Sequence, residues 1–496
     1  MASAASATTT ENSAHQVSES DRHPVFWVSG LMAGVGLQLL TLLTEPPAGM
    51  TVMAWHCAGL ALMMAVFWAV EILPTAITAL FPLIFAPMMG INSIDGAAAP
   101  YAHPVIYLFM GGFAIGLAME RWHLHSRVAL NIMLLVGTGE KRLVLGFMTA
   151  TALISMWVSN AATTIMMLPI GLSVVAMIRD QGRMSNGFPI ALLLAIAYGA
   201  SIGGFGTLIG TPPNALLVAF LQDQYGIQIE FARWLIIGVP ASLLMLIVTG
   251  LWLGYLGYDL CSKENQVIKQ SIREQRKDLG KMSTPEKIVA VIFCGTAIAW
   301  VTRPWLIDLF PGFFITDAAI ALIATILLFV LPSNLRKLQF LMSWNDMRRL
   351  PWDVLLLFGG GLSLASMIRR TGLSDWIAGS LNFVGDMPEL MVIAMVVAII
   401  IFLTEITSNT ATTAAFLPPL GALATSFGMS PVALAIPAAI AASCAFMLPV
   451  ATPPNAIVYG AGMLPIRHMI RSGLVLNLAG IAIITLLSQW LIKWVV

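Results

Sequence analysis

Charged side chains are scarce in this chain of 496 residues, of which only 10% are Asp, Glu, Lys or Arg. A soluble chain carries roughly a quarter charged residues, so the low charge excludes a soluble enzyme. Hydrophobic residues make up 58% of the chain and gather in long runs. A run of about 17–25 apolar residues is long enough to cross the bilayer core as a helix. The composition therefore indicates a protein that crosses the lipid bilayer many times.

Cysteine is also rare, with four residues in the whole chain. Cys57, Cys261, Cys294 and Cys444 show no C-x-x-C spacing, so they indicate neither a disulfide framework nor a metal site. We expect them to pack as small apolar residues. The net charge of +1 says little about partners, and we expect no nucleic acid among them.

A cleavable signal peptide is missing as well. Residues 1–24 are rich in Ser, Ala and Thr and contain no apolar core followed by a cleavage site. We predict that these residues form a disordered tail in the cytoplasm.

Thirteen apolar segments follow this tail. Two of them are too long for one straight crossing and are interrupted near the middle by polar residues. The segments are 26–44, 52–70, 72–90, 104–120, 143–178, 188–220, 232–258, 288–305, 315–332, 352–368, 390–424, 431–463 and 473–494. The two long ones are 143–178 and 390–424.

Lys and Arg residues indicate which loops lie in the cytoplasm. Seven of them lie within residues 259–287, which we therefore predict to be a cytoplasmic linker. Basic residues stand on both sides of 143–178, so this segment enters and leaves from the cytoplasm as a re-entrant hairpin. Acidic residues precede 390–424 and no Lys or Arg occurs in 425–430. We predict that this second hairpin enters from outside, although Arg369 and Arg370 count against it.

The predicted fold is an all-α polytopic membrane protein with about eleven transmembrane helices and two opposed re-entrant hairpins. Residues 25–258 form an N-terminal half with the first hairpin, and residues 288–496 form a C-terminal half with the second. We expect the protein to lie in the inner cell membrane. Its N-terminus is expected in the cytoplasm and its C-terminus on the outer side of this membrane.

The two halves carry the same motifs in the same order. Ser159-Asn160 falls on Ser408-Asn409 at a fixed offset, and Leu168-Pro169 falls on Leu417-Pro418. The Thr-Pro-Pro-Asn run at 211–214 is repeated at 452–455. Because the charge pattern places the halves in opposite orientations, we predict an inverted-topology repeat, an architecture common among secondary transporters.

The repeated motifs combine polar groups with helix breaks inside the membrane, where such groups are costly unless they are buried or line a cavity. Adjacent prolines remove backbone donors, so we expect the helix to unwind at each Thr-Pro-Pro-Asn run. Freed carbonyls are good ligands for a hard cation, and the N-termini of half-helices favour an anion. The motifs therefore favour an anionic substrate together with small cations.

Other residues of interest are expected to have structural roles. Glu405 lies inside a hairpin arm, but Met156 stands at its equivalent position, so we interpret it as a structural partner. His123 and His125 lie in a basic loop, where a solvated role is expected ahead of metal binding. The Gly-Gly pairs at 111–112, 203–204 and 359–361 are expected to allow close helix packing.

The motifs resemble those of the divalent anion:sodium symporter family, from about the third span to the end of the chain. The resemblance is carried by Thr404-Glu405 with Ser408-Asn409-Thr410, by the matching first tip, and by the run at 451–456. It implies a homodimer whose scaffold domain stays fixed while a transport domain moves. It also implies co-transported sodium, no organic cofactor, and C4-dicarboxylate or related substrates.

The resemblance further implies two sodium sites and one substrate site. The first sodium site would use Ser155, Asn160 and Gly210, and the second would use Thr404, Asn409 and Ala451. The substrate carboxylates would be held by Ser159, Asn160, Ser408, Asn409, Thr410, Thr452 and Pro453. Ala161 stands where the family usually has Thr, which affects the expected substrate preference.

We expect a secondary active transporter that imports a small dicarboxylate or tricarboxylate, such as succinate, with sodium by alternating access. A sodium-independent anion exchanger remains an alternative. A cation:proton antiporter would need buried carboxylates near the breaks, and only Glu405 comes close. A membrane-embedded enzyme would need convergent Asp or His residues, and the sequence shows none.

Overall fold

A computed structural model describes residues 24–180, 184–263, 266–309, 315–380 and 387–491. Almost the entire predicted N-terminal tail therefore lies outside the described residues, as does the C-terminal end of the chain. The described part is almost entirely helical, and its one sheet is a short antiparallel pair, β1 (Pro332–Asn334) and β2 (Gln339–Phe340). The predicted all-α class is confirmed.

Most helices of the first half follow the predicted apolar segments, but residues 94–102 and 124–136 are also helical although they lie between those segments. The helices are α2 (Pro24–Leu43), α3 (Val52–Val70), α4 (Thr75–Thr78), α5 (Phe81–Met88), α6 (Ile94–Ala98), η1 (Ala99–Ala102), α7 (Pro104–Arg121), α8 (Leu124–Val136), α9 (Glu140–Ser155), α10 (Asn160–Asp180), α11 (Phe188–Gly204), α12 (Pro212–Tyr225) and α13 (Phe231–Leu251), which continues as the π-helical turn η2 (Trp252–Leu256).

The rest of the chain begins with a helix rich in charged residues. Its helices are α14 (Gln266–Asp278), α15 (Thr284–Leu309), α16 (Asp317–Val330), η3 (Leu335–Lys337), α17 (Trp344–Met347), α18 (Trp352–Arg370), α19 (Leu373–Ser380), α20 (Glu389–Thr404), α21 (Asn409–Ser426), α22 (Val432–Ala442), η5 (Pro449–Ala451), α23 (Pro453–Gly460) and α24 (Ile466–Leu491).

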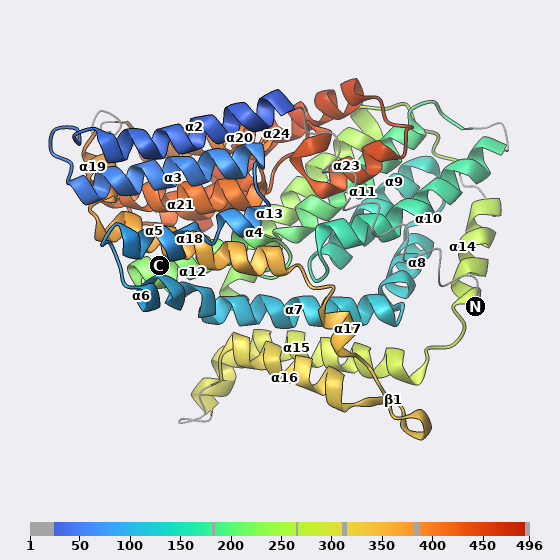
Figure 1. Ribbon diagram of the computed structural model, residues 1–496. Coiled ribbons are helices and arrows are strands. Elements are labelled where there is room, and N and C mark those ends of the chain that lie inside the picture. Colours follow the sequence, from blue (N-terminus) through green and yellow to red (C-terminus); the bar gives the residue numbers. More distant parts are fainter. Residues whose placement is uncertain (1–23, 181–183, 264–265, 310–314, 381–386, 492–496) are drawn as a thin grey trace.

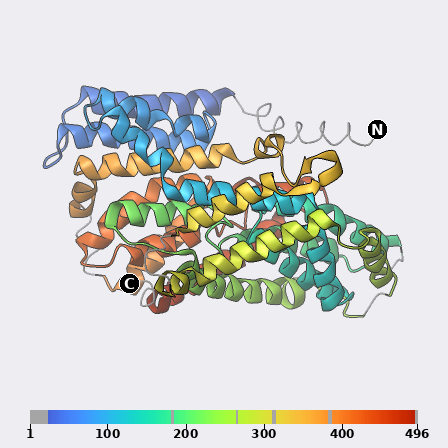
Figure 2. The same cartoon turned by 90° about the horizontal axis from the view of Figure 1, so that it is seen from below.

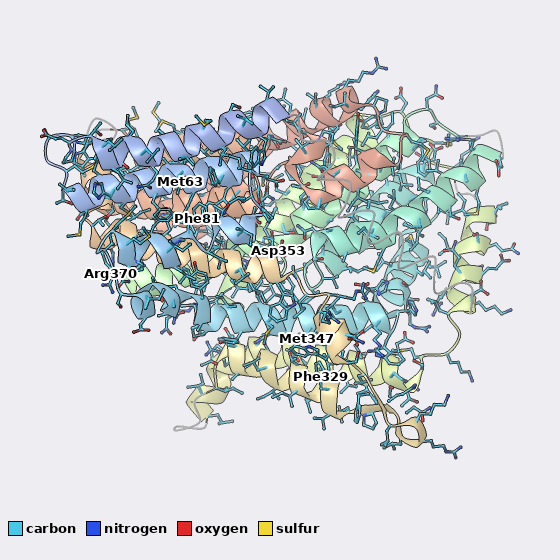
Figure 3. The ribbon with its side chains drawn as sticks, viewed as in Figure 1. Met63, Phe81, Phe329, Met347, Asp353 and Arg370 are labelled. Carbon is cyan, nitrogen blue, oxygen red and sulfur yellow. The ribbon has the colours of Figure 1, made fainter. Side chains whose placement is uncertain are left out.

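Seven helices in the described ranges are long and apolar enough to cross a membrane, and seven shorter apolar helices accompany them. Several of the shorter helices are halves of a broken crossing or arms of a hairpin, because α9 and α10 pair, α20 and α21 pair, and α11 continues into α12 after a break. This arrangement fits a polytopic membrane protein, and the number of eleven crossings with two re-entrant hairpins stays a prediction. In the long helix α18, the charged side chains lie at the two ends, as Asp353 and Arg370 show (Figure 3).

Each hairpin packs against parts of both broken helices. The first hairpin, α9 and α10, lies on α11, and α10 also contacts α23 from the other half. The second hairpin, α20 and α21, lies on α22, and α21 also contacts α12 (Figure 1). Figure 2 shows α15 and α16 running side by side along one face next to α7, outside this central group. The two halves are thus interlocked around the hairpins and the broken helices.

Glycine allows several of these helices to approach closely. A Cβ added at Gly203 would lie 2.2 Å from the carbonyl oxygen of Ala152, and one at Gly199 would lie 2.7 Å from that of Met148. Both glycines are on α11 and face α9, so the first hairpin rests directly on the backbone of α11. Gly111 and Gly360 likewise touch the backbone of neighbouring elements. The expected packing role of the glycine pairs is confirmed.

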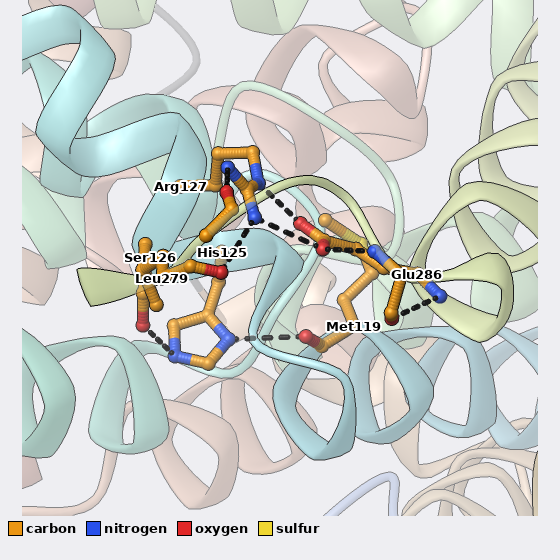
Figure 4. A network of polar contacts seen from close by, with 8 residues as sticks. Met119, His125, Ser126, Arg127, Leu279 and Glu286 are labelled. Carbon is orange, nitrogen blue, oxygen red and sulfur yellow. Dashed lines mark hydrogen bonds and ion pairs between the residues drawn. The ribbon is translucent and has the colours of Figure 1, made fainter. Parts of the chain in front are cut away.

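The expectation that the two loop histidines are solvated is wrong for His125. His123 is exposed, but His125 is buried because α8 folds back against α9 and α14. Its Nδ1 lies 3.1 Å from the carbonyl oxygen of Met119 and its Nε2 lies 2.8 Å from Ser126 Oγ (Figure 4). Burial lowers the pKa of His125, which lies outside the predicted spans, and the hydrogen bond to Met119 opposes this shift. Within the described ranges, no group of His, Cys, Asp or Glu residues could hold a metal ion.

An ion pair beside His125 connects α8 to the start of α15. Arg127 binds Glu286 through both Nε and Nη2, and its Nη1 donates to the carbonyl of Gly280 at 3.0 Å (Figure 4). The four cysteines are all free, with Cys57 and Cys444 buried as expected and Cys294 exposed.

Candidate functional site

The two hairpin tips have the same internal geometry. In the first tip, Ser155 Oγ donates to Asn160 Oδ1 at 2.7 Å. In the second, Thr404 Oγ1 donates to Asn409 Oδ1 at 2.8 Å. Each Asn begins the second helix of its hairpin and each hydroxyl residue ends the first, so the contact closes the turn between them. The sequence repeat is therefore reproduced in the hydrogen bonds of the tips.

The remaining predicted residues lie at these tips or at the breaks of α11–α12 and α22–α23. Ser159 and Ser408 directly precede α10 and α21, and both are half-buried together with Asn160 and Asn409. Thr410 is buried, whereas Ala161 at its equivalent position is partly exposed.

The breaks in the two long helices are also alike. Residues 205–211 separate α11 from α12, and residues 443–452 separate α22 from α23. Thr211 and Thr452 have almost the same extended conformation, with φ of −144° in both and ψ of 142° and 149°. Thr452 also caps α23, since its hydroxyl accepts from Asn455 N at 3.3 Å.

The prediction that the helix unwinds at the two prolines is corrected by this geometry. The prolines occupy the first positions of α12 and α23, and the unwound residues precede them. Proline is favoured there because the first N–H groups of a helix have no intrahelical partner. The Thr-Pro-Pro-Asn run therefore starts the second half-helix and fixes where the unwound segment ends.

The first tip meets the first break at close range. A Cβ at Gly204 would lie 2.5 Å from Asn160 Oδ1, and one at Gly210 would lie 2.2 Å from the Gly204 carbonyl oxygen. Thr207 Oγ1 in the same segment donates to the carbonyl of Met156 and accepts from Gly210 N at 3.1 Å. The structure thus brings Ser155 and Asn160 together with the unwound segment that carries Gly210.

The second tip is joined to its broken helix through different groups. Thr404 Oγ1 lies 3.0 Å from the carbonyl oxygen of Ala442, the last residue of α22. Ala451 is buried in the turn η5, and its N donates to the Leu448 carbonyl at 3.2 Å. No hydrogen bond among the described residues joins Ala451 to Thr404 or Asn409. Pro453 is exposed, unlike its neighbour Thr452.

Glu405 holds the unwound segment of the second half by its backbone. Its carboxylate accepts from the N–H groups of Phe446 at 2.7 Å, Met447 at 2.9 Å and Leu448 at 3.0 Å. A fourth donor is Asn477 Nδ2 on α24, at 2.7 Å. The interpretation of Glu405 as a structural partner agrees with this network. Reasoning from sequence missed Asn477, although a polar residue within an apolar segment was a signal.

The two tips are uncharged apart from Glu405. In the described ranges, none of the side chains that hydrogen-bond to residues 155–164 or 404–413 is Lys or Arg, and no hydrogen bond joins one tip to the other. The meeting of the tips at the middle of the membrane therefore stays a prediction. A site built from hydroxyls, amides and carbonyls can bind both cations and anions without a fixed positive charge.

Comparison with known proteins agrees with the motifs. Residues 27–496 match the model of the sodium:sulfate symporter transmembrane region. The sodium-dependent dicarboxylate transporter SdcS of Staphylococcus saprophyticus is 39% identical over 96% of this chain and 93% of its own length. The transporter of the same name from Staphylococcus aureus is 38% identical over 93% of this chain and 90% of its own length.

Solved structures show a related fold at low sequence identity. The Alcanivorax borkumensis YdaH transporter has a TM-score of 0.55 and 15% identity, over 92% of this chain and 98% of that one. Neisseria gonorrhoeae MtrF also has a TM-score of 0.55, with 13% identity, over 94% and 95% of the two chains. With the family model covering almost the whole chain, this multi-pass membrane protein belongs to the sodium:sulfate symporter family, the divalent anion:sodium symporters expected from its hairpin motifs.

Proposed function

We propose that this protein is a secondary active transporter that imports a small dicarboxylate, such as the C4 acid succinate, together with sodium. The observation that carries the proposal is the pair of equivalent hairpin tips, Ser155–Asn160 and Thr404–Asn409, each placed at a broken helix. The names of the SdcS relatives support sodium and a dicarboxylate as the transported species. Sodium is a transported substrate in this proposal, and no organic cofactor takes part.

Each half supplies one sodium site. The first uses Ser155, Asn160 and Gly210, and the second uses Thr404, Asn409 and Ala451. The packing of Asn160 against Gly204, and of Gly204 against Gly210, supports the first set. The tie between Thr404 and the end of α22 supports the second. Oxygen atoms of amides, hydroxyls and unwound backbone are suitable ligands for a hard cation.

The substrate lies between the tips in this proposal. Its carboxylates are held by Ser159, Asn160, Ser408, Asn409, Thr410, Thr452 and Pro453. Because none of these residues is basic, the two sodium ions neutralise the negative charge of the substrate. Uptake of the dianion then depends on sodium, which gives the coupling its physical basis.

The transport cycle requires one part of the molecule to move against another. We assign the moving part to the two hairpins and the broken helices, which pack on one another in both halves. The halves 25–258 and 288–496 are inverted repeats joined by the linker 259–287, with the N-terminus in the cytoplasm. Two copies form a homodimer in the lipid bilayer of the inner cell membrane.

Uptake of radiolabelled succinate into proteoliposomes tests the proposal. Uptake should require an inward sodium gradient and should be abolished in Asn160→Ala and Asn409→Ala. Asn131→Ala, on α8 away from the tips, is the control and should transport normally. Uptake that needs only a counter-anion inside the vesicles, with no sodium, would establish the exchanger instead. Thermal stabilisation by cations that depends on pH, without any effect of dicarboxylates, would favour an antiporter.

A further inference from the structure

The Asn that ends each Thr-Pro-Pro-Asn run has equivalent contacts in both halves. Asn214 Nδ2 donates to the carbonyl of Thr207 at 2.7 Å. Asn455 Nδ2 donates to the carbonyl of Leu448 at 3.0 Å and to that of Ala445 at 3.1 Å. Thr207 and Leu448 each lie seven residues before their Asn. Each Asn therefore reaches back across the two prolines to the unwound segment of its own broken helix.

Both Asn side chains are fully buried, with 0% of their surface exposed. Among the residues that the structure describes, neither Oδ1 atom has a hydrogen-bond partner. A buried acceptor without a partner costs about 1–3 kcal/mol, so an apolar residue of similar shape would pack at lower cost. An amide at both positions is thus explained by its N–H groups, which are the donors that the two sites share.

The carbonyl that each Asn holds belongs to a residue that also contacts a proposed sodium ligand. Thr207 Oγ1 accepts from Gly210 N at 3.1 Å. The Leu448 carbonyl accepts from Ala451 N at 3.2 Å as well as from Asn455. Gly210 and Ala451 stand three residues after Thr207 and Leu448 in the chain. Fixing Thr207 or Leu448 therefore fixes the turn that carries the ligand.

We infer that Asn214 and Asn455 are positioning residues for sodium, one for each site; this inference rests on the proposed function. Each Asn clamps its unwound segment so that the backbone carbonyl of Gly210 or Ala451 is oriented before the ion arrives. Neither Asn binds the ion. Groups that orient the ligands of a metal ion usually affect its affinity strongly, because a loose ligand must be ordered on binding.

The test replaces each Asn by Leu, which has a similar shape but no polar group, in the same proteoliposome assay. The sodium concentration for half-maximal uptake should rise about tenfold in Asn214→Leu and in Asn455→Leu, as for other groups that orient metal ligands. The Km for succinate at saturating sodium should change little, and the Tm in sodium-free buffer should fall by about as much as in a control that loses one buried hydrogen bond. The matched control is Ser363→Ala, which removes a buried hydrogen bond of 3.0 Å to the Ala97 carbonyl in another part of the fold.

The Asp variants separate positioning from direct binding and also serve if a Leu variant does not fold. Asp keeps the shape and the oxygen atoms of Asn but, when ionised at alkaline pH, has no hydrogen to donate. Sodium affinity should fall as in the Leu variants. Retained or improved affinity would show that the site does not need the N–H groups of the Asn and would overturn the inference. Unchanged sodium dependence in the Leu variants would overturn the inference alone, whereas wild-type uptake independent of sodium would overturn the proposed function and the inference together.

Discussion

At the residue scale, one carboxylate distinguishes the two halves of this molecule. Glu405 accepts hydrogen bonds from three consecutive backbone N–H groups. These groups belong to the unwound segment and have no helical partners. Met156 stands at the equivalent position of the first half, where the Thr207 hydroxyl links the unwound segment to the tip instead. The same task is thus performed by a carboxyl group in one half and by a hydroxyl group in the other.

Replacing this carboxylate by an amide should destabilise the second unwound segment. In Glu405→Gln, the NH₂ group would face backbone donors, and hydrogen bonds to charged groups contribute about 1.5–3 kcal/mol each. We expect a clearly lower Tm for the purified protein in detergent, and a smaller decrease for Asn477→Leu, which removes one of the four donors. Glu389→Gln, at the exposed start of α20, is the control. A Tm equal to that of the wild type in Glu405→Gln would contradict the anchoring role.

The residues of the tips could be predicted from sequence because the repeat keeps them in register. The pairing of Glu405 with Asn477 could not, since the two residues are 72 positions apart and nothing in the local pattern connects them. His125 was misjudged for a related reason. Basic neighbours suggested a solvated loop, but the packing of α8 against α9 and α14 decides its burial.

At the scale of the elements, the hairpins depend on glycine in the helices below them. Gly203→Ala would place a Cβ against the backbone of Ala152 on α9, and backbone atoms cannot move aside as a flexible side chain can. We expect this variant to lose at least about 1–3 kcal/mol, seen as a lower Tm and as aggregation in size-exclusion chromatography.

Gly295→Ala provides the opposite case. Nothing lies within 4 Å of a Cβ at Gly295 on α15, and Ala is favoured over Gly in a helix by about 1 kcal/mol. This variant should keep or slightly raise the Tm. If Gly203→Ala and Gly295→Ala had the same Tm, the close approach of α9 and α11 would not explain why glycine occupies position 203.

Sequence patterns located the elements well but not the side of the prolines on which a helix breaks. Most apolar runs matched helices, since length and hydrophobicity are properties of single segments, but α8 was not among the predicted segments. The two Pro-Pro pairs indicated breaks, and we expected unwinding at the prolines themselves. Proline at the first helical position was the rule that applied, so the unwound residues are 205–211 and 443–452.

At the scale of the whole molecule, polar contacts connect the hairpin-bearing part to the helices around it. His103, which caps α7, lies 3.1 Å from Asp223 on α12. Arg369, at the end of α18, donates to the carbonyl of Gln224, which is also on α12. If α12 moves with the hairpins, these contacts must break during each cycle.

A short crosslink across this boundary should therefore stop transport. We expect His103→Cys with Asp223→Cys, in a background without Cys261 and Cys294, to lose succinate uptake after treatment with a short thiol crosslinker and to recover if the crosslinker is cleaved. The control crosslinks Glu120→Cys with Arg349→Cys, an ion pair of 2.8 Å that lies outside the moving part. Full activity of the crosslinked His103–Asp223 pair would rule out movement of α12 against α7.

The most direct test of the central claim measures sodium and dicarboxylate fluxes in the same proteoliposomes. With both species radiolabelled, an inward succinate gradient should drive sodium uptake, and an inward sodium gradient should drive succinate uptake. Both driven fluxes should disappear in Asn160→Ala and in Asn409→Ala, since each variant removes one side of the paired site. Succinate uptake that persists when sodium is replaced by choline, or sodium flux that is independent of succinate, would contradict the account.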